Sequence, residues 1–500
     1  MKISFFVFFL SIFIVTGCIK KKDAALHVQL STEPVSLDPS LVEDGGAFRV
    51  LAPLMHGLFR YDGKGTLVHA LAEKVSVSSQ NKRFVYKVLL KKVQWSDGVP
   101  VTAQHFVDSI ERTLNPSTPS KLVDLLYVIE NAKAYREKKI LFSSVGVSAK
   151  SDLELEFILN KPISYFAHLL ALPIFYPQRK EAPGKVTTGP YFLKEWKIGE
   201  KFLLEKNPYY KDFPEQAPKQ IVFQIIPEEI TALQLFKTGK LQILTKAPYT
   251  DLQELQKKGL VRSFPFRATY YIGINHRVKP WNSEDLRCEF SESVDREGIM
   301  QILNGDGIPS HHWAPQTGVS SNSAIHAKTG FLRKLKLLDE NTRELSFDGG
   351  HRNKLIAEKI QGDFLKKYDV KLELKTKDWK THIQNLTAYP TALFRFGWMS
   401  PFLHPIAHYL IFKSDNPNNY TGWKNPEYDK IIEAMETAAD ENHLKELAAK
   451  ADSILTEKDC VIAALYHYKL SFVVSGSVKY IEINELGLID FLTLVWQNES

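Results

Sequence analysis

An apolar segment at the amino terminus constrains the chain most. Residues 3–15 are apolar apart from Ser4 and Ser11, and they directly follow Lys2. The segment is shorter than the roughly 20 residues that a helix needs to cross a bilayer. It is followed by small residues, a pattern typical of an export signal with its processing site. Because no second apolar span follows, we expect the rest of the chain to fold as one body outside the cytoplasm.

The processing site resembles a lipobox, Val15-Thr16-Gly17-Cys18. In this interpretation residues 1–17 are a lipoprotein signal peptide, and Cys18 becomes the acylated first residue of the mature protein. An acyl chain beside the three lysines at 20–22 would supply the two signals that stable membrane attachment needs. The alternatives are a plain signal peptide with a chance cysteine or a short membrane anchor. The sequence thus predicts a periplasmic or cell-surface protein that is lipid-anchored to a bacterial membrane.

Length and composition indicate a globular protein of two or three domains, because 500 residues exceed what one core usually supports. The 64 basic and 57 acidic residues are mixed along the chain, which argues against a nucleic-acid-binding protein, since that class concentrates its basic residues. Cys288 and Cys460 remain in the mature chain. They could pair in an oxidising compartment, but their distance in sequence carries no framework information, and free buried thiols are the preferred interpretation.

Segments with strand and helix patterns alternate along the chain, which indicates α/β layering. No flexible linker separates them, so strand-like crossings are expected to join the lobes. The predicted strands cover residues 84–90, 192–196, 202–205, 221–226, 269–274 and 370–375. The predicted helices cover 231–238, 282–302, 353–368 and 440–455, and a further helix begins after a capping Thr102.

Motifs of common enzymes are missing from the sequence. It contains no G-x-S-x-G nucleophile elbow, no phosphate-binding P-loop and no H-E-x-x-H zinc helix. The densest histidine cluster is His311-His312, and adjacent residues of an extended chain point to opposite sides. We therefore predict a structural loop there, no catalytic residues, no metal site and no cofactor.

A set of longer motifs resembles the peptide and nickel class of extracellular solute-binding proteins, family 5, the receptors of ATP-driven (ABC) importers. The longest motif is residues 95–107, WSDGVPVTAQHFV, preceded by Leu71-Ala72-Glu73. Shorter matches follow in the family's order at residues 36–39, 188–191, 207–210, 239–243, 294–296 and 423–429. The resemblance covers nearly the whole mature chain and is strongest to the oligopeptide-binding proteins.

This resemblance implies an α/β fold of the periplasmic binding protein-like type (type II, cluster C), with two lobes around a ligand cleft and an extra domain. Its implied boundaries are 18–45, 186–266 and 469–500 for the discontinuous lobe I, 46–185 for the extra domain II and 267–468 for lobe III. The chain is then a receptor and not an enzyme, and we expect a monomer that binds no nucleic acid.

The resemblance also implies a binding mode and a set of ligand-binding residues. In these relatives the ligand lies extended and pairs through its main chain like an added strand. Arg395 resembles the arginine that meets the ligand carboxylate, with a structural ion pair as the alternative. Trp379 resembles a pocket-lining tryptophan, with core packing as the alternative. The remaining implied ligand-binding residues are Trp398, Met399, Glu33, Asn418 and Tyr466.

One departure from the family concerns the ligand's amino group. Peptide-binding relatives carry an aspartate three residues after the tryptophan that matches Trp398, and this aspartate anchors the ammonium. Here that position holds Pro401. Either Glu33 or another acid replaces it, or the ligand has no free amino terminus there, because an unpaired buried ammonium is costly.

The sequence therefore predicts a substrate-binding lipoprotein that captures short peptides or peptide-like solutes and delivers them to the permease of an ABC importer. One alternative is a receptor of the same fold for a non-peptide ligand, such as a metal chelate, haem or a glutathione-like solute. A further alternative is a surface adhesin or chaperone-like protein built on the same scaffold.

Overall fold

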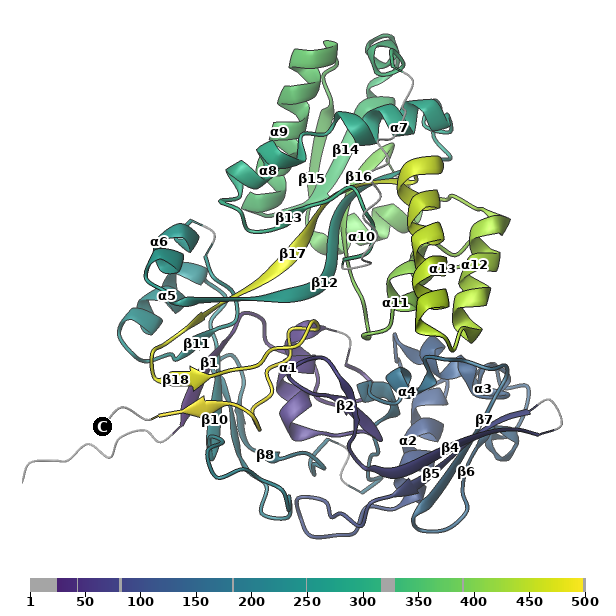
Figure 1. Ribbon diagram of the computed structural model, residues 1–500, viewed down its shortest axis with the longest axis vertical. Helices are drawn as coiled ribbons and strands as arrows, with labels where there is room; N and C mark the ends of the chain where they lie inside the picture. The colour runs from purple at the N-terminus through teal and green to yellow at the C-terminus, as the bar shows by residue number, and fades with distance from the viewer. Residues whose placement is uncertain are drawn as a thin grey trace, which may run out of the picture.

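The computed structural model describes residues 25–42, 44–80, 83–181, 184–248, 250–315, 329–388 and 391–497. The predicted signal peptide and Cys18 lie outside these ranges. Within them, no helix combines the length and the apolarity needed to cross a bilayer. The described chain forms an elongated body with an upper and a lower part (Figure 1).

One path of paired strands runs through both parts of the molecule. The pairing is mixed, because β1 is parallel to β10 whereas β12 is antiparallel to both β16 and β17. In spatial order the strands are β15 (Glu373–Lys377), β14 (Glu344–Asp348), β16 (Leu393–Met399), β12 (Val261–Ile274), β17 (Ile462–Val474), β11 (Ile243–Leu244), β1 (Leu26–Leu30), β10 (Gln220–Ile225), β9 (Lys201–Lys206) and β8 (Tyr191–Lys197), and β13 (Ile308–Pro309) pairs with β17.

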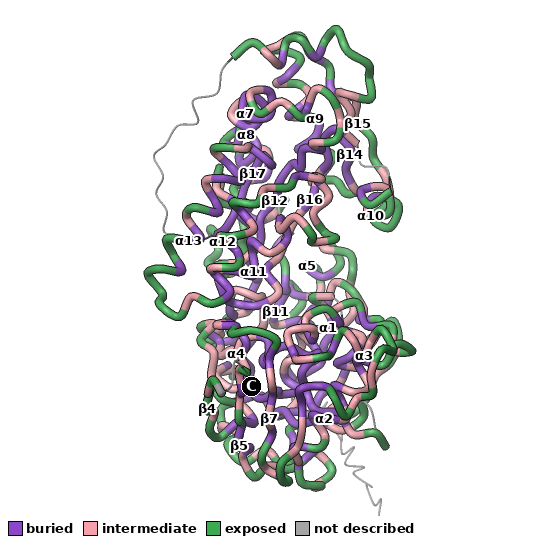
Figure 2. The backbone as a smooth tube through the Cα atoms, turned by 90° about the vertical axis from the view of Figure 1, so that its right-hand side faces the viewer, coloured by how far each residue is buried: buried purple, intermediate pink, exposed green. Residues whose placement is uncertain are grey.

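The long strands β12 and β17 connect the two parts of the body (Figure 1). Residues 261–265 of β12 pair with 469–473 in the lower part, and residues 269–273 pair with 462–467 in the upper part. Between Pro265 and Thr269 the register shifts, which marks an irregularity in the strand pair. β17 is buried over most of its length, and β12 is buried from Ala268 to its end (Figure 2). These are the strand-like crossings that the sequence predicts.

Helices cover the upper part of the sheet. Three of them begin at polar caps, because the side chains of Asp295, Asn425 and Asp440 accept hydrogen bonds from amides of the first turn. The upper elements are α7 (Glu284–Ser293), α8 (Arg296–Ile302), η4 (Leu332–Leu337), η5 (Glu340–Arg343), α9 (His351–Tyr368), α10 (Trp379–Ala388), α11 (Ile406–Tyr409), η6 (Leu410–Phe412), α12 (Pro426–Thr437), α13 (Glu441–Ser453) and the π-helical turn η7 (Ile454–Lys458).

The prediction of one helix over residues 282–302 is wrong. Two helices, α7 and α8, share this range, and Val294 and Asp295 separate them. Asp295 accepts a hydrogen bond of 2.9 Å from the Gly298 amide and thereby caps α8. Aspartate side chains compete for local backbone N–H groups, so a helix tends to start there and not to continue.

The lower part combines the lower strands with a smaller second sheet. The predicted strand at 84–90 is β5, and the predicted helix after Thr102 is α2, so both predictions are confirmed. The second sheet has the order β4-β5-β7-β6. The elements here are α1 (Gly45–Leu54), β2 (Phe59–Tyr61), β3 (Leu67–His69), β4 (Ala72–Gln80), β5 (Arg83–Leu90), α2 (Ala103–Leu114), η1 (Val123–Val128), α3 (Ala132–Arg136), η2 (Phe142–Ser144), β6 (Val147–Ala149), β7 (Glu154–Leu159), α4 (Phe166–Leu169), η3 (Pro173–Phe175), α5 (Glu229–Lys237), α6 (Leu252–Lys257), β18 (Val478–Tyr480) and β19 (Val495–Trp496).

In the part of the chain that the structure describes, the buried apolar residues form three clusters. One lies in the upper part around Tyr270 and Phe290, and a small one lies around α5 and α6. The largest joins the lower part to α11–α13 and to the segment before α11, where Phe402 stacks on Tyr165 with ring centroids 5.5 Å apart. The helices α11–α13 thus pack on the lower part as well as on the upper sheet.

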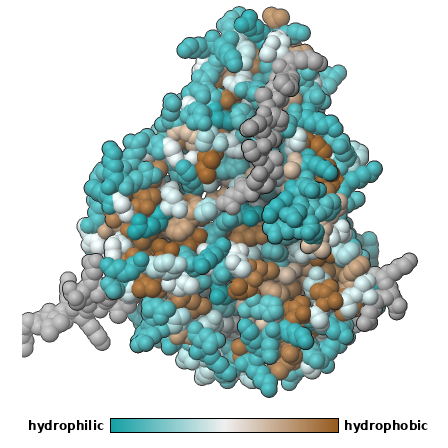
Figure 3. Space-filling view, viewed as in Figure 1, coloured by the Kyte–Doolittle hydropathy of each residue, from teal (hydrophilic) through white to brown (hydrophobic). Residues whose placement is uncertain are grey.

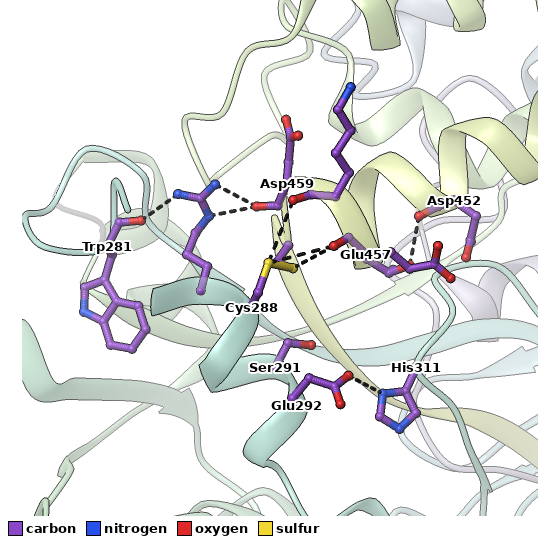
Figure 4. The surroundings of a disulfide bond; sticks show 12 residues. Trp281, Cys288, Ser291, Glu292, His311, Asp452, Glu457 and Asp459 are labelled. Carbon is purple, nitrogen blue, oxygen red and sulfur yellow. Dashed lines mark hydrogen bonds and ion pairs between the residues drawn. A yellow bond between two sulfur atoms is a disulfide. The ribbon is translucent and has the colours of Figure 1, made fainter. Parts of the chain in front are cut away.

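Cys288 and Cys460 form a disulfide, so the expectation of free buried thiols is wrong. They are 172 residues apart, and the fold brings them together by laying α7 beside the start of β17. Next to the bond, the Arg287 guanidinium donates two hydrogen bonds to the Asp459 carbonyl, of 3.0 and 2.7 Å, and one of 3.1 Å to the Trp281 carbonyl (Figure 4). These bonds fasten α7 to the segment that leads into β17.

Candidate functional site

The strand β16 has one open edge in the upper part. Along its first edge it pairs with β12 over its whole length. Along its second edge it pairs with β14 only at Leu393 and Phe394. Beyond Phe394 no strand neighbour follows within the described residues. The Arg395 carbonyl on this edge accepts a hydrogen bond of 2.9 Å from His382 Nε2.

The main-chain groups of two residues remain on this open edge. The Ser400 amide donates to the Arg267 carbonyl at 2.9 Å, which makes these residues a hydrogen-bonded pair of the β12–β16 ladder. In antiparallel ladders such pairs alternate with pairs that point away from the partner strand. The N–H and C=O groups of Gly397 and Met399 therefore face outward from β12, where an extended ligand could pair with them.

Arg395 lies beside this edge in a nearly buried ion pair. Its Nη1 is 2.6 Å from Asp348 Oδ1, and the two side chains are 13% and 14% exposed. Its Nη2 donates to the Tyr468 hydroxyl at 3.0 Å, and its guanidinium lies 4.7 Å from the centre of the Tyr270 ring. Burial lowers the pKa of Arg395, but Tyr468, Tyr270 and Asp348 outweigh burial and raise it. Arg395 Nε is buried without a hydrogen-bond partner. The structural ion pair, which the sequence analysis gave as the alternative to a ligand-binding role for Arg395, is present.

The predicted aromatic residues lie along β16. Trp379 begins α10, is 53% exposed and stacks on Phe396 with ring centroids 6.0 Å apart, so core packing does not describe it. Trp398 is half-buried, and its Nε1 has no hydrogen-bond partner. Met399 is also half-buried. These three side chains, with the open edge, form a surface that can contact a ligand.

Glu33 lies in the lower part and is already engaged. Its Oε1 accepts a hydrogen bond of 2.9 Å from Trp196 Nε1, and both carboxylate oxygens accept from the Gly199 amide at 3.1 Å. Glu33 therefore holds the turn between β8 and β9 against the loop that follows β1. It is not a free acid that could replace an aspartate at position 401.

Asn418 and Tyr466 are not brought to the open edge. Asn418 is exposed in the loop before α12, and its amide donates to Asn416 Oδ1 at 2.9 Å. Tyr466 is 0% exposed and stacks on Tyr270 with centroids 4.9 Å apart. It thus lies one layer behind Arg395. Its burial raises its pKa well above the usual value.

Three neighbours of Arg395 and β16 were missed from the sequence: Asp348, Tyr468 and His382. Asp348 is the last residue of β14 and is followed by Gly349. An acidic residue at the end of a predicted strand is the sequence signal that could have identified Asp348. Tyr468 lies two residues after Tyr466 on β17, and in a strand this spacing returns a side chain to the same face. No sequence pattern connects His382 with β16.

The pair His311-His312 does not form a joint site. His311 Nδ1 is 3.6 Å from the Glu292 carboxylate (Figure 4). His312 Nδ1 is instead 3.0 Å from Asp452. Asp452 also accepts a hydrogen bond of 3.0 Å from the Trp313 amide, so it fixes this loop. Across the described ranges, no group of three or more His, Cys, Asp or Glu side chains is arranged to hold a metal ion. These contacts agree with the predicted structural loop.

A cavity of about 620 Å³ lies apart from the open edge, between α4 and the helices α11–α13. His168 and His404 both line it, and their rings are in edge-to-face contact with centroids 5.2 Å apart. Burial lowers the pKa of His168 to about 4 and that of His404 to about 3, and nearby Arg267 adds to both shifts. Both rings are therefore neutral near pH 7.

The surface facing the viewer in Figure 3 is mostly hydrophilic over the upper part, and its apolar side chains gather lower down, towards the level where the two parts meet. At this level Met399 and Pro401 from the upper part line the same small hollow as Phe48 and Leu486 from the lower part. The end of β16 therefore lies at the junction between the two parts of the molecule.

Comparisons with known proteins agree with this architecture. Residues 66–420 match the family described as "Bacterial extracellular solute-binding proteins, family 5 Middle". The chain is 28% identical to the oligopeptide-binding protein OppA of Bacillus subtilis (strain 168), over 94% of this chain and 93% of the relative. It is 26% identical to the "Probable deoxycholate-binding periplasmic protein YgiS" of Escherichia coli (strain K12), over 87% and 86% of the two chains.

A solved structure shows the same fold. OppA of Haemophilus influenzae in complex with the peptide RPPGFSPFR matches with a TM-score of 0.79 and 24% identity, over 95% of this chain and 100% of that one. The predicted fold class is confirmed. Solute-binding proteins of this family are transport receptors, so the prediction that the chain is not an enzyme is also confirmed. The chain belongs to the bacterial extracellular solute-binding proteins of family 5, the family that its sequence motifs resemble.

Proposed function

We propose that the protein is the substrate-binding lipoprotein of an ABC importer, which captures short peptides or peptide-like solutes and delivers them to the membrane permease. The family and the relative named as an oligopeptide-binding protein support this function. The observation that carries the proposal is the open edge of β16, where Gly397 and Met399 present unpaired main-chain groups. A peptide backbone is the ligand chemistry that completes such an edge as an added strand.

The cleft in this proposal lies between the upper part, lobe III, and the strands and loops of lobe I below it. The register shift of β12 between Pro265 and Thr269 lies where β12 and β17 pass from one lobe to the other. The proposed domain boundaries at 266/267 and 468/469 fall at this level. A hinge there would let the lobes close over a bound solute through small changes in few residues.

In this proposal, different side chains contact different parts of the ligand. Arg395 binds the ligand carboxylate, because its Nε has no partner and its charge is held in place by Asp348. Trp379, Trp398 and Met399 line the space for ligand side chains. Glu33, Asn418 and Tyr466, which contact other parts of the protein, shape the walls of the cleft and support them.

The proposed lipid anchor involves residues outside the described ranges. Cys18 would carry the lipid, and the lysines at 20–22 would contact the membrane surface. Metabolic labelling with a radioactive fatty acid tests this role. The label should appear on the wild-type protein and disappear from Cys18→Ser, and an unlabelled wild-type protein would contradict the lipid anchor.

Isothermal titration of the delipidated mature body tests the proposed function. The ligands are di- to pentapeptides of mixed sequence and cell-wall peptides. Binding should be accompanied by a smaller radius of gyration in small-angle scattering, since the hinge closes. The proposal fails if no peptide binds and the body keeps the same radius of gyration with every one of them.

A second candidate function is a receptor of the same fold for a non-peptide solute. The apolar hollow at the end of β16 and the relative named as deoxycholate-binding favour it. Native mass spectrometry of protein purified under mild conditions distinguishes the two candidates. A retained ligand with a peptide mass supports the first, and a retained sterol-like or other non-peptide mass supports the second.

A further inference from the structure

The open edge of β16 ends at a small apolar hollow. The hollow has a volume of about 60 Å³ and is closed on three sides by α1, by the segment after α4 and by the loop before β19. Met399 and Pro401 line it at the end of β16. Its wall also includes the apolar side chains of Phe48, Leu172, Pro173 and Leu486. A ligand that follows the open edge past Met399 brings one of its ends to this hollow.

The polar side chains of the hollow are already used inside the protein. The Tyr61 hydroxyl lies 2.8 Å from His168 Nδ1 and accepts a hydrogen bond of 3.0 Å from the Leu403 amide. The Tyr176 hydroxyl donates to the Ala171 carbonyl at 3.1 Å. Ser400 Oγ is 2.8 Å from His408 Nδ1. The residues that line the hollow include no Asp or Glu.

A guanidinium without an acid partner lies behind the wall of this hollow, against the segment that contains Leu486 and Leu488. Arg49 follows Phe48 on α1, and its Nε donates to the Gly487 carbonyl at 3.2 Å, between Leu486 and Leu488 of the hollow. The acid nearest in sequence to Gly487 is Glu485, which forms an ion pair with Arg267. Arg49 has no carboxylate partner anywhere in the described ranges. Burial lowers its pKa, since no neighbouring charge offsets the lost hydration.

These features exclude a free ammonium at this end of the cleft. An ammonium here would lose its water, would find no carboxylate and would lie close to the positive charge of Arg49. An amide cap has no charge to desolvate. Its apolar tail suits the hollow, and its carbonyl oxygen can accept a hydrogen bond from Arg49, as carbonyls do from guanidinium groups.

We propose that the ligand carries an acylated amino end, whose apolar cap fills the hollow and whose carbonyl oxygen accepts a hydrogen bond from Arg49. This inference rests on the proposed function, in which Arg395 takes the carboxylate and the opposite end of the ligand reaches Pro401. It identifies the substrate class as amino-blocked peptides or peptide-like solutes and excludes peptides with free amino ends as the preferred ligands.

Matched peptide libraries test the inference on the unaltered delipidated protein. The same tri- and tetrapeptides are titrated with a free amino end and with an N-acetyl end. The acetylated form should bind at least about tenfold more tightly. Equal or tighter binding of the free-amino form overturns the inference and leaves the proposed function standing. If neither form binds, the proposed function itself fails.

Two variants locate the effect at the hollow. Arg49→Met should weaken the acetylated peptide about tenfold while changing the free-amino peptide little, because only the acetylated form has a carbonyl oxygen at this place. Pro401→Asp should reverse the preference by supplying a carboxylate. Arg333→Ala removes an exposed guanidinium far along the chain and serves as the control. An unchanged preference in both hollow variants contradicts the assignment, provided that their thermal unfolding matches that of the control.

Discussion

Arg395 and Asp348 show how one contact changes the expected behaviour of a binding residue. The pair is 2.6 Å apart, and both side chains are mostly buried. A ligand carboxylate that approaches Arg395 therefore meets a guanidinium whose charge is already partly balanced. At the same time each member of the pair keeps the other from being buried alone, which is the costly state for a charge.

The first prediction concerns the removal of Asp348. Asp348→Asn should tighten the binding of a ligand with a free carboxylate by about tenfold, since the full charge of Arg395 becomes available. The amidated form of the same ligand should show no gain. Isothermal titration of the two ligand forms measures this difference, and an equal change for both forms would remove Arg395 from the carboxylate site.

Removal of the other member of the pair, Arg395, should affect both ligand binding and the stability of the fold. Arg395→Ala leaves Asp348 nearly buried without its cation, so we expect a loss of about 3 kcal/mol in the free energy of unfolding. Affinity for the carboxylate ligand should also fall. Urea unfolding measures the first effect, with Arg333→Ala as the control that removes an exposed arginine. A stability equal to that of the control would show that Asp348 does not depend on Arg395.

Local motifs predicted some residues of the site and could not predict others. Arg395 and Trp398 lie within one short motif, and the exposed Trp379 stacks on a residue of the same strand. Asp348 reaches Arg395 only because the parallel strands β14 and β16 are neighbours in the sheet. The sequence offers Glu33 as one acid that could replace an aspartate at position 401, but its partners lie in a hairpin more than 160 residues away. Contacts of this kind follow from the fold and leave no mark in local sequence.

At the scale of elements, the main-chain groups of β16 alternate in role. Those of Gly397 and Met399 face the open edge and can bind a ligand, whereas those of Trp398 pair with β12 and stabilise the sheet. The second prediction uses this alternation. Met399→Pro removes an N–H that faces the open edge, so it should weaken a peptide ligand about tenfold and change the unfolding midpoint little. Trp398→Pro removes an N–H of the β12 ladder and should instead destabilise the protein.

Met399→Ala is the matched control for this prediction. It removes the same side chain but keeps the main-chain N–H. Its affinity for the peptide should lie clearly above that of Met399→Pro. If the alanine and proline variants bind equally well, the side chain and not the strand edge is the contact, and the added-strand mode of binding is wrong.

The pairing of α7 with the start of β17 gives the third prediction. The disulfide between Cys288 and Cys460 closes a loop of 172 residues, and such cross-links stabilise mainly by restricting the unfolded chain. The double variant Cys288→Ala, Cys460→Ala should therefore lose about 2 to 5 kcal/mol in the free energy of unfolding. Urea unfolding measures the loss.

A reducing agent provides the internal control for the disulfide. It should destabilise the wild-type protein by a similar amount and leave the double variant unchanged. A wild-type unfolding curve that does not move on reduction would contradict a stabilising role. The sequence could not decide this pairing, because only the arrangement of α7 beside β17 brings the two cysteines together.

At the scale of the whole molecule, the alternation of strands and helices predicted the fold class, and the crossing strands followed from the absence of a linker. The attachment of α11–α13 to the lower part could not be predicted. It depends on contacts such as the hydrogen bond of 2.8 Å from the Ser164 amide to the Glu436 carbonyl, which joins residues far apart in the sequence. These contacts also bury several histidines between the parts of the body.

The buried histidines give the fourth prediction, which concerns acid stability. Burial lowers the pKa of His56, His276 and His404 to about 3, and that of His168 and His467 to about 4, from an ordinary value of 6.5. As the pH falls below 6.5, the unfolded chain takes up protons at these positions and the folded protein does not. The free energy of unfolding should therefore be highest above pH 6.5 and should fall as the pH drops towards 4.

The size of this effect makes it measurable. Each such histidine contributes up to about 1.4 kcal/mol per pH unit in this window, so several together exceed a typical domain stability within about two pH units. His312 acts in the opposite direction, because its hydrogen bond to Asp452 raises its pKa. It adds stability below pH 6.5 that is lost as the pH rises through its raised pKa. One such group cannot offset five, so the net free energy of unfolding should decrease as the pH falls from 6.5 to 4.

A single substitution tests the origin of the acid sensitivity. His404→Gln removes one of the neutral buried rings, so the slope of the unfolding free energy against pH should decrease by about 1.4 kcal/mol per pH unit between pH 6 and 4. The control is His443→Gln, which changes a histidine whose side chain is 56% exposed on α13 and should leave the slope as it is. Urea unfolding followed by circular dichroism at several pH values measures both slopes. Equal slopes in the two variants would mean that the acid sensitivity comes from groups other than His404, and a wild-type stability that stays constant from pH 7 to 5 would exclude the buried histidines as its cause.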